Sequence, residues 1–224
     1  AMGWNTVNKV RTPLKATDFS SYIAPVLNSG ADVLVLNHYG GNMVNSLTNA
    51  VPFGLRDKVV NNKNFEIIVP LYSRLMAKGA GANVKGIFGS TNWHWSLQDE
   101  GSKAFVKSFG TKYGFPPSQA AHTVYCQTLL YADACNRAGT FNPCGVGEAL
   151  EGFEFDGLGN GKTLYRADDH QCFKDVLVVK GKENPTSEFD LLEIVEVTPM
   201  EQVKYAPDHP MFAGGDLGAC NPGA

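Results

Sequence analysis

The chain has 224 residues, of which 43% are hydrophobic and 18% charged, and 19 basic against 22 acidic residues leave a formal net charge of −3. This composition is typical of a globular protein and excludes intrinsic disorder. The small negative charge, without any long Lys/Arg cluster, excludes the basic surface that nucleic acids and anionic membranes require, and no apolar stretch approaches the ~20 residues that span a bilayer.

The first half of the sequence predicts alternating strands and helices. Its β-branched apolar runs lack period-two alternation, which is typical of strands covered on both faces in a parallel sheet. The expected strands are residues 10–13, 31–36, 65–69 and 84–88, and the expected helices are 17–29, 43–53 and 72–78. This order predicts a doubly wound α/β sheet, with ligands expected beyond the carboxyl ends of the strands.

The second half of the sequence predicts a helical block. The expected helices are residues 102–113, 118–138 and 144–150, followed by a hairpin over 154–166, strands at 173–180 and 191–197, and an irregular tail from Pro199. Phe105, Phe109 and Tyr113 recur at helical spacing and must be buried against another layer. No parallel strands that could form this layer are visible in the block, so we expect part of its sheet to be missing.

The candidate ligand-binding residues lie in the three loops that follow the predicted parallel strands. They are Asn37, His38, Tyr39 and Gly40 after the first strand, Leu71 and Tyr72 after the second, and Trp93 and Trp95 after the third. Polar groups and backbone amides in such loops can reach a ligand, and indole rings can stack on it or donate a hydrogen bond to it. The alternatives are an ordinary surface turn for the first loop and hinge packing for the tryptophans.

Two other patterns resemble catalytic or phosphate-binding motifs but fail on spacing. The run 157–163 would need a glycine where Asp156 stands to be a phosphate-binding loop, and no helix follows it, so a hairpin turn is predicted instead. Asp168-Asp169-His170 could imitate a carboxylate–histidine pair, but adjacent side chains on an extended segment point apart and no nucleophile elbow accompanies them.

Several groups of residues carry a resemblance to a known family. They are Pro13-Leu14 with 17–21, 29–33 with Ala50 and 53–55, 115–120 with Tyr125, Ala134 and 138–140, and 168–171 before 176–179, followed by Phe189-Asp190, Pro199 and Cys220. In this order they resemble the periplasmic solute-binding proteins of branched-chain amino acid type ABC transporters, which have the type I periplasmic-binding fold. The resemblance covers the chain from Val10 onward.

The resemblance implies that this chain is the C-terminal portion of a two-lobed protein. Residues 1–92 would form most of lobe two, 93–170 the helical part of an incomplete lobe one, and 171–224 the return strands to lobe two and the C-terminal tail. The first-lobe strands of the family come from a segment that would precede this chain. Because apolar helix faces and strand edges would then be open, we expect a homodimer that covers them.

The resemblance also implies the function. We expect a non-enzymatic, extracytoplasmic (periplasmic) component of an ABC uptake transporter, its signal peptide removed, which binds a small molecule in an interlobe cleft without a metal or cofactor and presents it to the permease. Amino-acid-binding members carry a carboxylate near the strand end occupied here by Leu71. An α-amino ligand would lack its counter-charge, so a carboxylate, an amide or an aromatic acid is expected.

The sequence allows several roles for the five cysteines. No CxxC motif occurs, and we expect disulfides, with Cys135–Cys144 and Cys172–Cys220 as candidates among several allowed pairings and Cys126 as a buried thiol. A metal site on His122 and Cys126 with the 170–172 segment is disfavoured because the family is metal-free. The alternative functions are a thiol-dependent α/β hydrolase using Cys126 or Cys172, and a sensory ligand-binding domain of the same fold.

Overall fold

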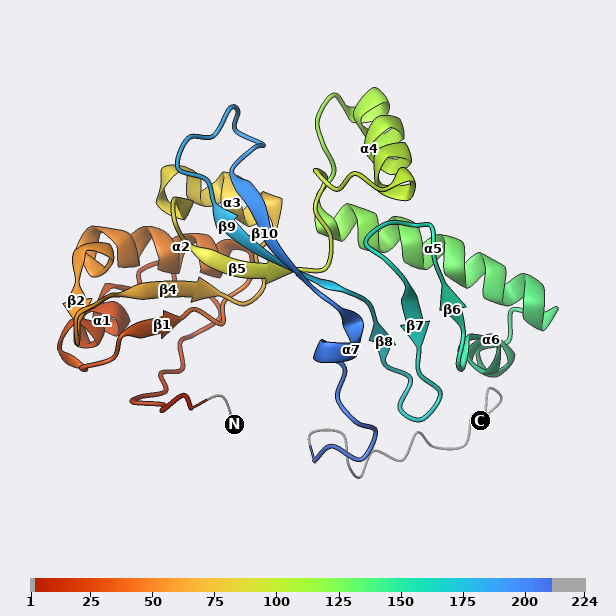
Figure 1. Cartoon of the computed structure of the whole chain (residues 1–224), viewed down its shortest axis with the longest axis horizontal. Coiled ribbons are helices and arrows are strands. Elements are labelled where there is room, and N and C mark those ends of the chain that lie inside the picture. The colour runs from red at the N-terminus through yellow and green to blue at the C-terminus, as the bar shows by residue number, and fades with distance from the viewer. Residues whose placement is uncertain (1–2, 211–224) are drawn as a thin grey trace. The chain divides into compact units, whose positions relative to one another are not determined.

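The structure, a computed structural model, describes residues 3–210, which divide into two compact units (Figure 1). Of the described residues, unit 1 contains 3–91 and 178–196, and unit 2 contains 92–177 and 197–210. The chain therefore crosses from one unit to the other three times, at 91/92, 177/178 and 196/197. In the part of the chain that the structure describes, no helix has the length and apolarity that crossing a membrane requires.

A five-stranded sheet in the order β1-β4-β5-β9-β10 organises unit 1. The strands are β1 (Val33–Val35), β4 (Glu66–Val69), β5 (Phe88–Thr91), β9 (Val176–Gly181) and β10 (Leu192–Thr198). β1 pairs parallel to β4, and β4 parallel to β5, which confirms the predicted parallel α/β architecture. Because β9 and β10 run through the second and third crossings, two of the three crossings are continuous strands.

Short helices connect the parallel strands of unit 1. They are α1 (Ser20–Ile23), α2 (Gly40–Ala50) and α3 (Arg74–Ala80), with 3₁₀ turns at Ala24–Asn28, Val51–Phe53, Leu55–Asp57 and Gly81–Val84. A small antiparallel pair, β2 (Val59–Val60) and β3 (Lys63–Asn64), precedes β4. α2 packs on α3, and the buried side chains of Met43, Leu47, Ile67 and Val69 form the core beneath them.

Three predicted elements of unit 1 differ from the structure. Residues 10–13 form no strand, since this segment makes no ladder bonds and Pro13 has no N–H to donate. The helix predicted over 17–29 becomes α1 and a 3₁₀ turn at Pro25, where the backbone donor is missing. The strand predicted over 84–88 begins only at Phe88, because Gly86 has a φ of +74°, which interrupts an extended chain.

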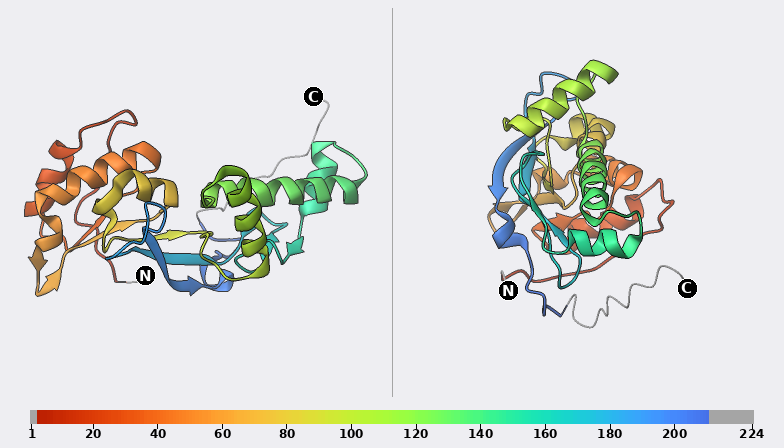
Figure 2. Two further views of the ribbon diagram at one scale, coloured as in Figure 1. Left: turned by 90° about the horizontal axis from the view of Figure 1, so that it is seen from above. Right: turned by 90° about the vertical axis from the view of Figure 1, so that its right-hand side faces the viewer.

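Unit 2 contains three longer helices and a small sheet. The helices are α4 (Glu100–Tyr113), α5 (Gln119–Ala138) and α6 (Pro143–Leu150), with the short α7 (Met200–Val203) after the third crossing. β6 (Glu154–Phe155), β7 (Thr163–Tyr165) and β8 (Cys172–Phe173) form an antiparallel sheet that contains the predicted hairpin. Phe105 of α4 packs on His122 and Tyr125 near the start of α5, where α4 crosses the longer helix (Figure 2).

Candidate functional site

The loops after β1 and β4 lie at one edge of the unit 1 sheet. The pairing of Val35 with Ile68 and of Val69 with Gly89 brings the carboxyl ends of β1, β4 and β5 level with one another. Beyond these ends, the N–H of Tyr72 donates to the carbonyl of Ser90 over 2.8 Å, which holds the second loop against the third strand. The predicted loops 37–41 and 70–73 are therefore neighbours, as parallel pairing requires.

His38 is bound within unit 1. Its Nδ1 lies 2.9 Å from Ser46 Oγ and its Nε2 lies 3.0 Å from Thr12 Oγ1. Because the Ser46 hydroxyl donates its hydrogen to the Met43 carbonyl, His38 Nδ1–H donates to Ser46, and Nε2 accepts from Thr12. Burial lowers the pKa of His38, which agrees with this neutral tautomer. The ring thus fixes the loop and joins the N-terminal segment to α2.

Other residues of this edge are open to solvent. Tyr39 is 54% exposed and Leu71 60% exposed, and Asn37 is also exposed, whereas Tyr72 is buried in the core. Gly40 adopts a φ of +58° at the start of α2, and its N–H points to Met76 Sδ at 3.0 Å. Among residues 3–210, no side chain caps this end of α2. The start of the helix therefore presents backbone N–H groups and the positive end of its dipole.

The three strand-end segments carry little formal charge. None of the segments 37–43, 70–76 and 89–95 contains Asp or Glu. Arg74, in the first turn of α3, is the one formal charge in these segments; it is buried and its guanidinium lies over the Phe189 ring, 5.3 Å from the centroid. Burial lowers the pKa of Arg74 and Glu188 opposes that shift. An ammonium group would find no counter-charge in these three segments.

In unit 2, Trp93 is fully enclosed. It is 1% exposed, its indole N–H donates to Ser102 Oγ over 2.9 Å, and its ring stacks on His122 at 4.3 Å between centroids. Ser102 in turn donates to Asp99, whose other oxygen accepts from the Ser102 N–H and caps α4. These contacts do not favour the predicted ligand contact by Trp93, whose ring is a packing element of unit 2.

Trp95 is placed differently from Trp93. Its side chain is half-buried, and its Nε1 is buried without a hydrogen-bond partner among the described residues. The neighbouring His94 ring lies 5.7 Å away. A buried indole N–H without an acceptor is costly, so an acceptor supplied by a ligand would stabilise it.

The bonding state of the cysteines contradicts the two predicted disulfides. Cys126, Cys135 and Cys172 are free, which contradicts the pairings Cys135–Cys144 and Cys172–Cys220. Cys135 is buried on α5, where it packs with Ala134 and Val146 of α6. Cys144 is disulfide-bonded, and Cys220 lies outside the described residues. The short link between α5 and α6 is thus stabilised by apolar packing.

The same region gives no support to thiol or metal chemistry. Burial raises the pKa of Cys126, and desolvation of its sulfur raises the pKa of Cys172, although Cys172 as a residue is exposed. Burial lowers the pKa of His122 to about 4, so a thiolate–imidazolium pair is disfavoured. Among residues 3–210, no cluster of three or more His, Cys, Asp or Glu side chains could hold a metal ion. His170 Nε2 instead lies 2.9 Å from Glu151 Oε1.

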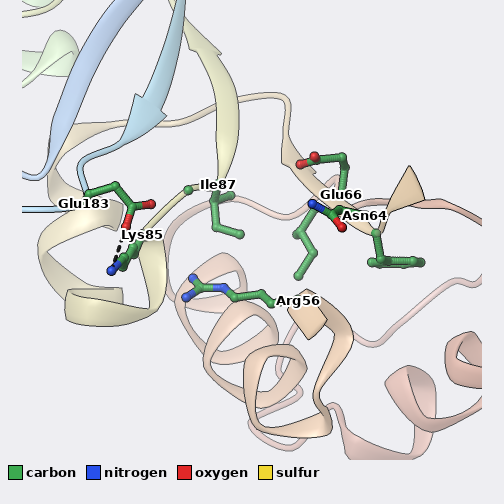
Figure 3. A pocket seen from close by; sticks show the side chains of 9 residues that line it. Arg56, Asn64, Glu66, Lys85, Ile87 and Glu183 are labelled. Carbon is green, nitrogen blue, oxygen red and sulfur yellow. Dashed lines mark ion pairs between the residues drawn. The ribbon is translucent and has the colours of Figure 1, made fainter. Parts of the chain in front are cut away.

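A hollow of 310 Å³ lies at the opposite edge of the unit 1 sheet, beside the amino ends of β4 and β5 (Figure 3). Its lining residues are Arg56, Asn64, Phe65, Glu66, Ile67, Lys85, Gly86, Ile87 and Glu183. Lys85 Nζ lies 2.7 Å from Glu183 Oε2, and Arg56 donates to the Asn83 carbonyl. Since Lys85 and Glu183 pair with each other and Arg56 donates to the backbone, this hollow is a weaker binding candidate than the strand-end loops.

The sequence and structure were compared with known proteins. The sequence profile of the periplasmic binding protein family matches residues 1–186. Among curated proteins, none gives a significant match. An amino acid ABC transporter substrate-binding protein from Pseudomonas fluorescens Pf-5 is similar to 88% of this chain over 52% of its own length, with 22% identity and a TM-score of 0.76.

Two further solved structures are similar. A branched-chain amino acid ABC transporter periplasmic ligand-binding protein from Burkholderia xenovorans LB400 has 27% identity and a TM-score of 0.71, covering 88% of this chain and 51% of its own. A solute-binding protein of an ABC transporter from Rhodopseudomonas palustris HaA2, in complex with p-hydroxybenzoic acid, has 18% identity and a TM-score of 0.75, covering 88% and 53%. The present chain spans about half the length of these structures.

Proposed function

Because the chain belongs to the periplasmic binding protein family, with the type I periplasmic-binding fold, we propose that it acts as part of a solute-binding component of an ABC transporter. The proposed location is extracytoplasmic, and the proposed partner is the permease of the transporter. The family and the similar structures are solute-binding proteins, which supports a non-enzymatic role. The raised pKa values of Cys126 and Cys172 further weaken the hydrolase alternative.

The proposed ligand is a small carboxylate, with an aromatic acid as the leading class. The observation that carries this proposal is the absence of Asp and Glu from all three strand-end segments, so that these segments offer an ammonium no counter-charge. The uncapped start of α2 offers N–H groups that favour an anion. The similar R. palustris protein binds p-hydroxybenzoic acid, and a second R. palustris solute-binding protein is in complex with 3,4-dihydroxybenzoic acid.

We assign different roles to the predicted site residues. Tyr39 and Leu71 would form an exposed apolar and aromatic surface, and Asn37 and the Gly40 backbone would supply polar contacts. Trp95, whose indole N–H has no partner among the described residues, would donate this hydrogen to an acceptor on the ligand. His38, Tyr72 and Trp93 would hold these groups in place from the protein interior, given their burial or their hydrogen bonds within the protein.

A fluorescence titration tests this proposal with two probes that share a phenol ring but differ in charge. In a Trp4→Phe background, p-hydroxybenzoate should change the emission of the remaining tryptophans, and tyramine, which carries an ammonium, should not. Trp95→Phe should weaken p-hydroxybenzoate binding about tenfold, the effect of losing one hydrogen bond to a charged acceptor. Tighter binding of tyramine, or an affinity unchanged in Trp95→Phe, would contradict the proposal.

A further inference from the structure

The glycine-rich run 157–161, which resembles a phosphate-binding loop in sequence, is tightly built into unit 2. Gly157, Gly159, Asn160 and Gly161 all have positive φ, at 109°, 104°, 59° and 69°. A Cβ on Gly159 would lie 2.4 Å from Ser102 Oγ and 3.2 Å from Trp93 Nε1. Glycine is therefore required at this position both by conformation and by close approach to the start of α4.

Three hydrogen bonds fix the backbone of this run. His122 Nε2 lies 2.7 Å from the Leu158 carbonyl, which makes Nε2 the donor, and Lys174 Nζ donates to the Gly159 carbonyl over 3.1 Å. The N–H of Asn160 donates to Asp99 Oδ2 over 3.4 Å. Since these partners come from three different parts of unit 2, the run is a rigid support for the side chain of Asn160.

The amide of Asn160 joins two crossings. It is 5% exposed, and its Nδ2 donates both hydrogens, one to the Asn92 carbonyl over 2.6 Å and one to the Asp175 carbonyl over 2.9 Å. Asn92 is the first residue of unit 2 after the 91/92 crossing, and Asp175 lies just before the 177/178 crossing.

The carboxylate of Asp175 extends the connection to the third crossing. Its Oδ1 accepts the N–H of Met200 over 2.8 Å, at the start of α7 and shortly after the 196/197 crossing. Asn92, Asp175 and Met200, distant in sequence, are thus linked within unit 2 through one buried side chain and one carboxylate.

We propose that Asn160 is a positioning residue that anchors the first two crossings to unit 2 directly and the third crossing through Asp175. Bending of the chain is then confined to the few residues between these anchors and unit 1, and the 92–95 segment, which ends in Trp95, keeps a fixed orientation in unit 2. The importance of Trp95 rests on the proposed function, whereas the anchoring does not. Asparagine suits the position because it tolerates left-handed φ and supplies two donors.

Hydrogen exchange measured by mass spectrometry, without any ligand, tests the anchor. Asn160→Asp keeps the side-chain size but places an acceptor against two carbonyl oxygens, and Asn160→Gly keeps the backbone freedom but removes both donors. The matched control is Asn62→Asp, because Asn62 is exposed in the β2–β3 turn with a φ of +63°. We expect exchange to rise about tenfold in peptides covering 92–98, 172–178 and 197–203, with α5 unchanged and the control like wild type.

A rise confined to residues 157–161, or a uniform rise that includes α5 and α6, would overturn the proposal. If the Asn160 variants do not fold, Asp175→Asn tests the last link alone, because it weakens only the acceptor of Met200. Exchange should then rise at 200–203 and nowhere else in unit 2, and unchanged exchange there would refute that link. Since no ligand is present, a failure of the anchor is distinguishable from a failure of ligand binding.

Discussion

His122 should make unit 2 sensitive to mild acid. Burial against Trp93 and Phe105 lowers its pKa from 6.5 to about 4. The unfolded chain therefore binds a proton that the folded chain excludes between these two pH values, so stability is fully present above pH 6.5 and is lost as the pH falls towards 4. Because the side chain is 1% exposed, little solvent screening reduces the effect, which amounts to about 2 kcal/mol between pH 7.5 and pH 5.

Urea denaturation followed by circular dichroism from pH 7.5 to 4.5 measures this effect. His122→Gln removes the titration but keeps an amide donor for the Leu158 carbonyl, so the variant should lose about 2 kcal/mol less than wild type between pH 7.5 and 5. His170→Gln serves as the control, since His170 is a surface partner of Glu151. Parallel pH profiles for wild type and His122→Gln would refute the reasoning.

Three further predictions follow from packing and exposure. Gly159→Ala should lower the free energy of unfolding of unit 2 by at least about 1 kcal/mol more than Gly114→Ala, as measured by thermal or urea unfolding. Gly114 also has a positive φ (+77°), but the space around an added Cβ there is open. Cys172, the exposed free thiol, should react first with a thiol reagent and no faster than a free cysteine, whereas Cys126 and Cys135 should react only on unfolding; a rapid thiolate would favour the hydrolase alternative. Val124 and Tyr131 of α5 are 67% and 51% exposed, so light scattering should give a dimer that Val124→Lys weakens; a wild-type monomer would contradict this.

Elements with local signals could be predicted from the sequence. The α5 helix begins after Ser118, whose Oγ accepts from the Ala121 N–H over 3.2 Å, and ends at Gly139 in the left-handed conformation, as its capping residues predicted. Elements that depend on distant partners were not predictable in the same way. The strand expected at 10–13 has a suitable composition, but a strand also needs a neighbour, and the segment is held instead by the Thr12–His38 contact.

The proximity of the strand-end loops could be predicted from the sequence, but the contacts of their side chains could not. The order of the elements predicts parallel strands, and parallel pairing places loops 37–41 and 70–73 at the same edge of the sheet. Which side chains face outward depends on packing, and this separates exposed Leu71 from buried Tyr72. The roles of Asp99 and Asn160 were missed, although the spacing of Asp99 and Ser102 is a capping signal for α4.

The reactive side chains of unit 2 are used to hold structure. His122, Asp99 and Lys174 each bind the 157–161 run, and Cys126 lies 3.4 Å from His122 Nε2 in the same buried cluster. Each would be a candidate for chemistry if it faced solvent, but burial leaves the imidazole neutral and the thiol protonated. Trp95 differs from these residues, because its buried indole N–H has no hydrogen-bond partner among residues 3–210 and it ends the 92–95 segment that Asn160 holds. In the proposed solute-binding role, such a fixed donor would orient a ligand without any reactive group nearby.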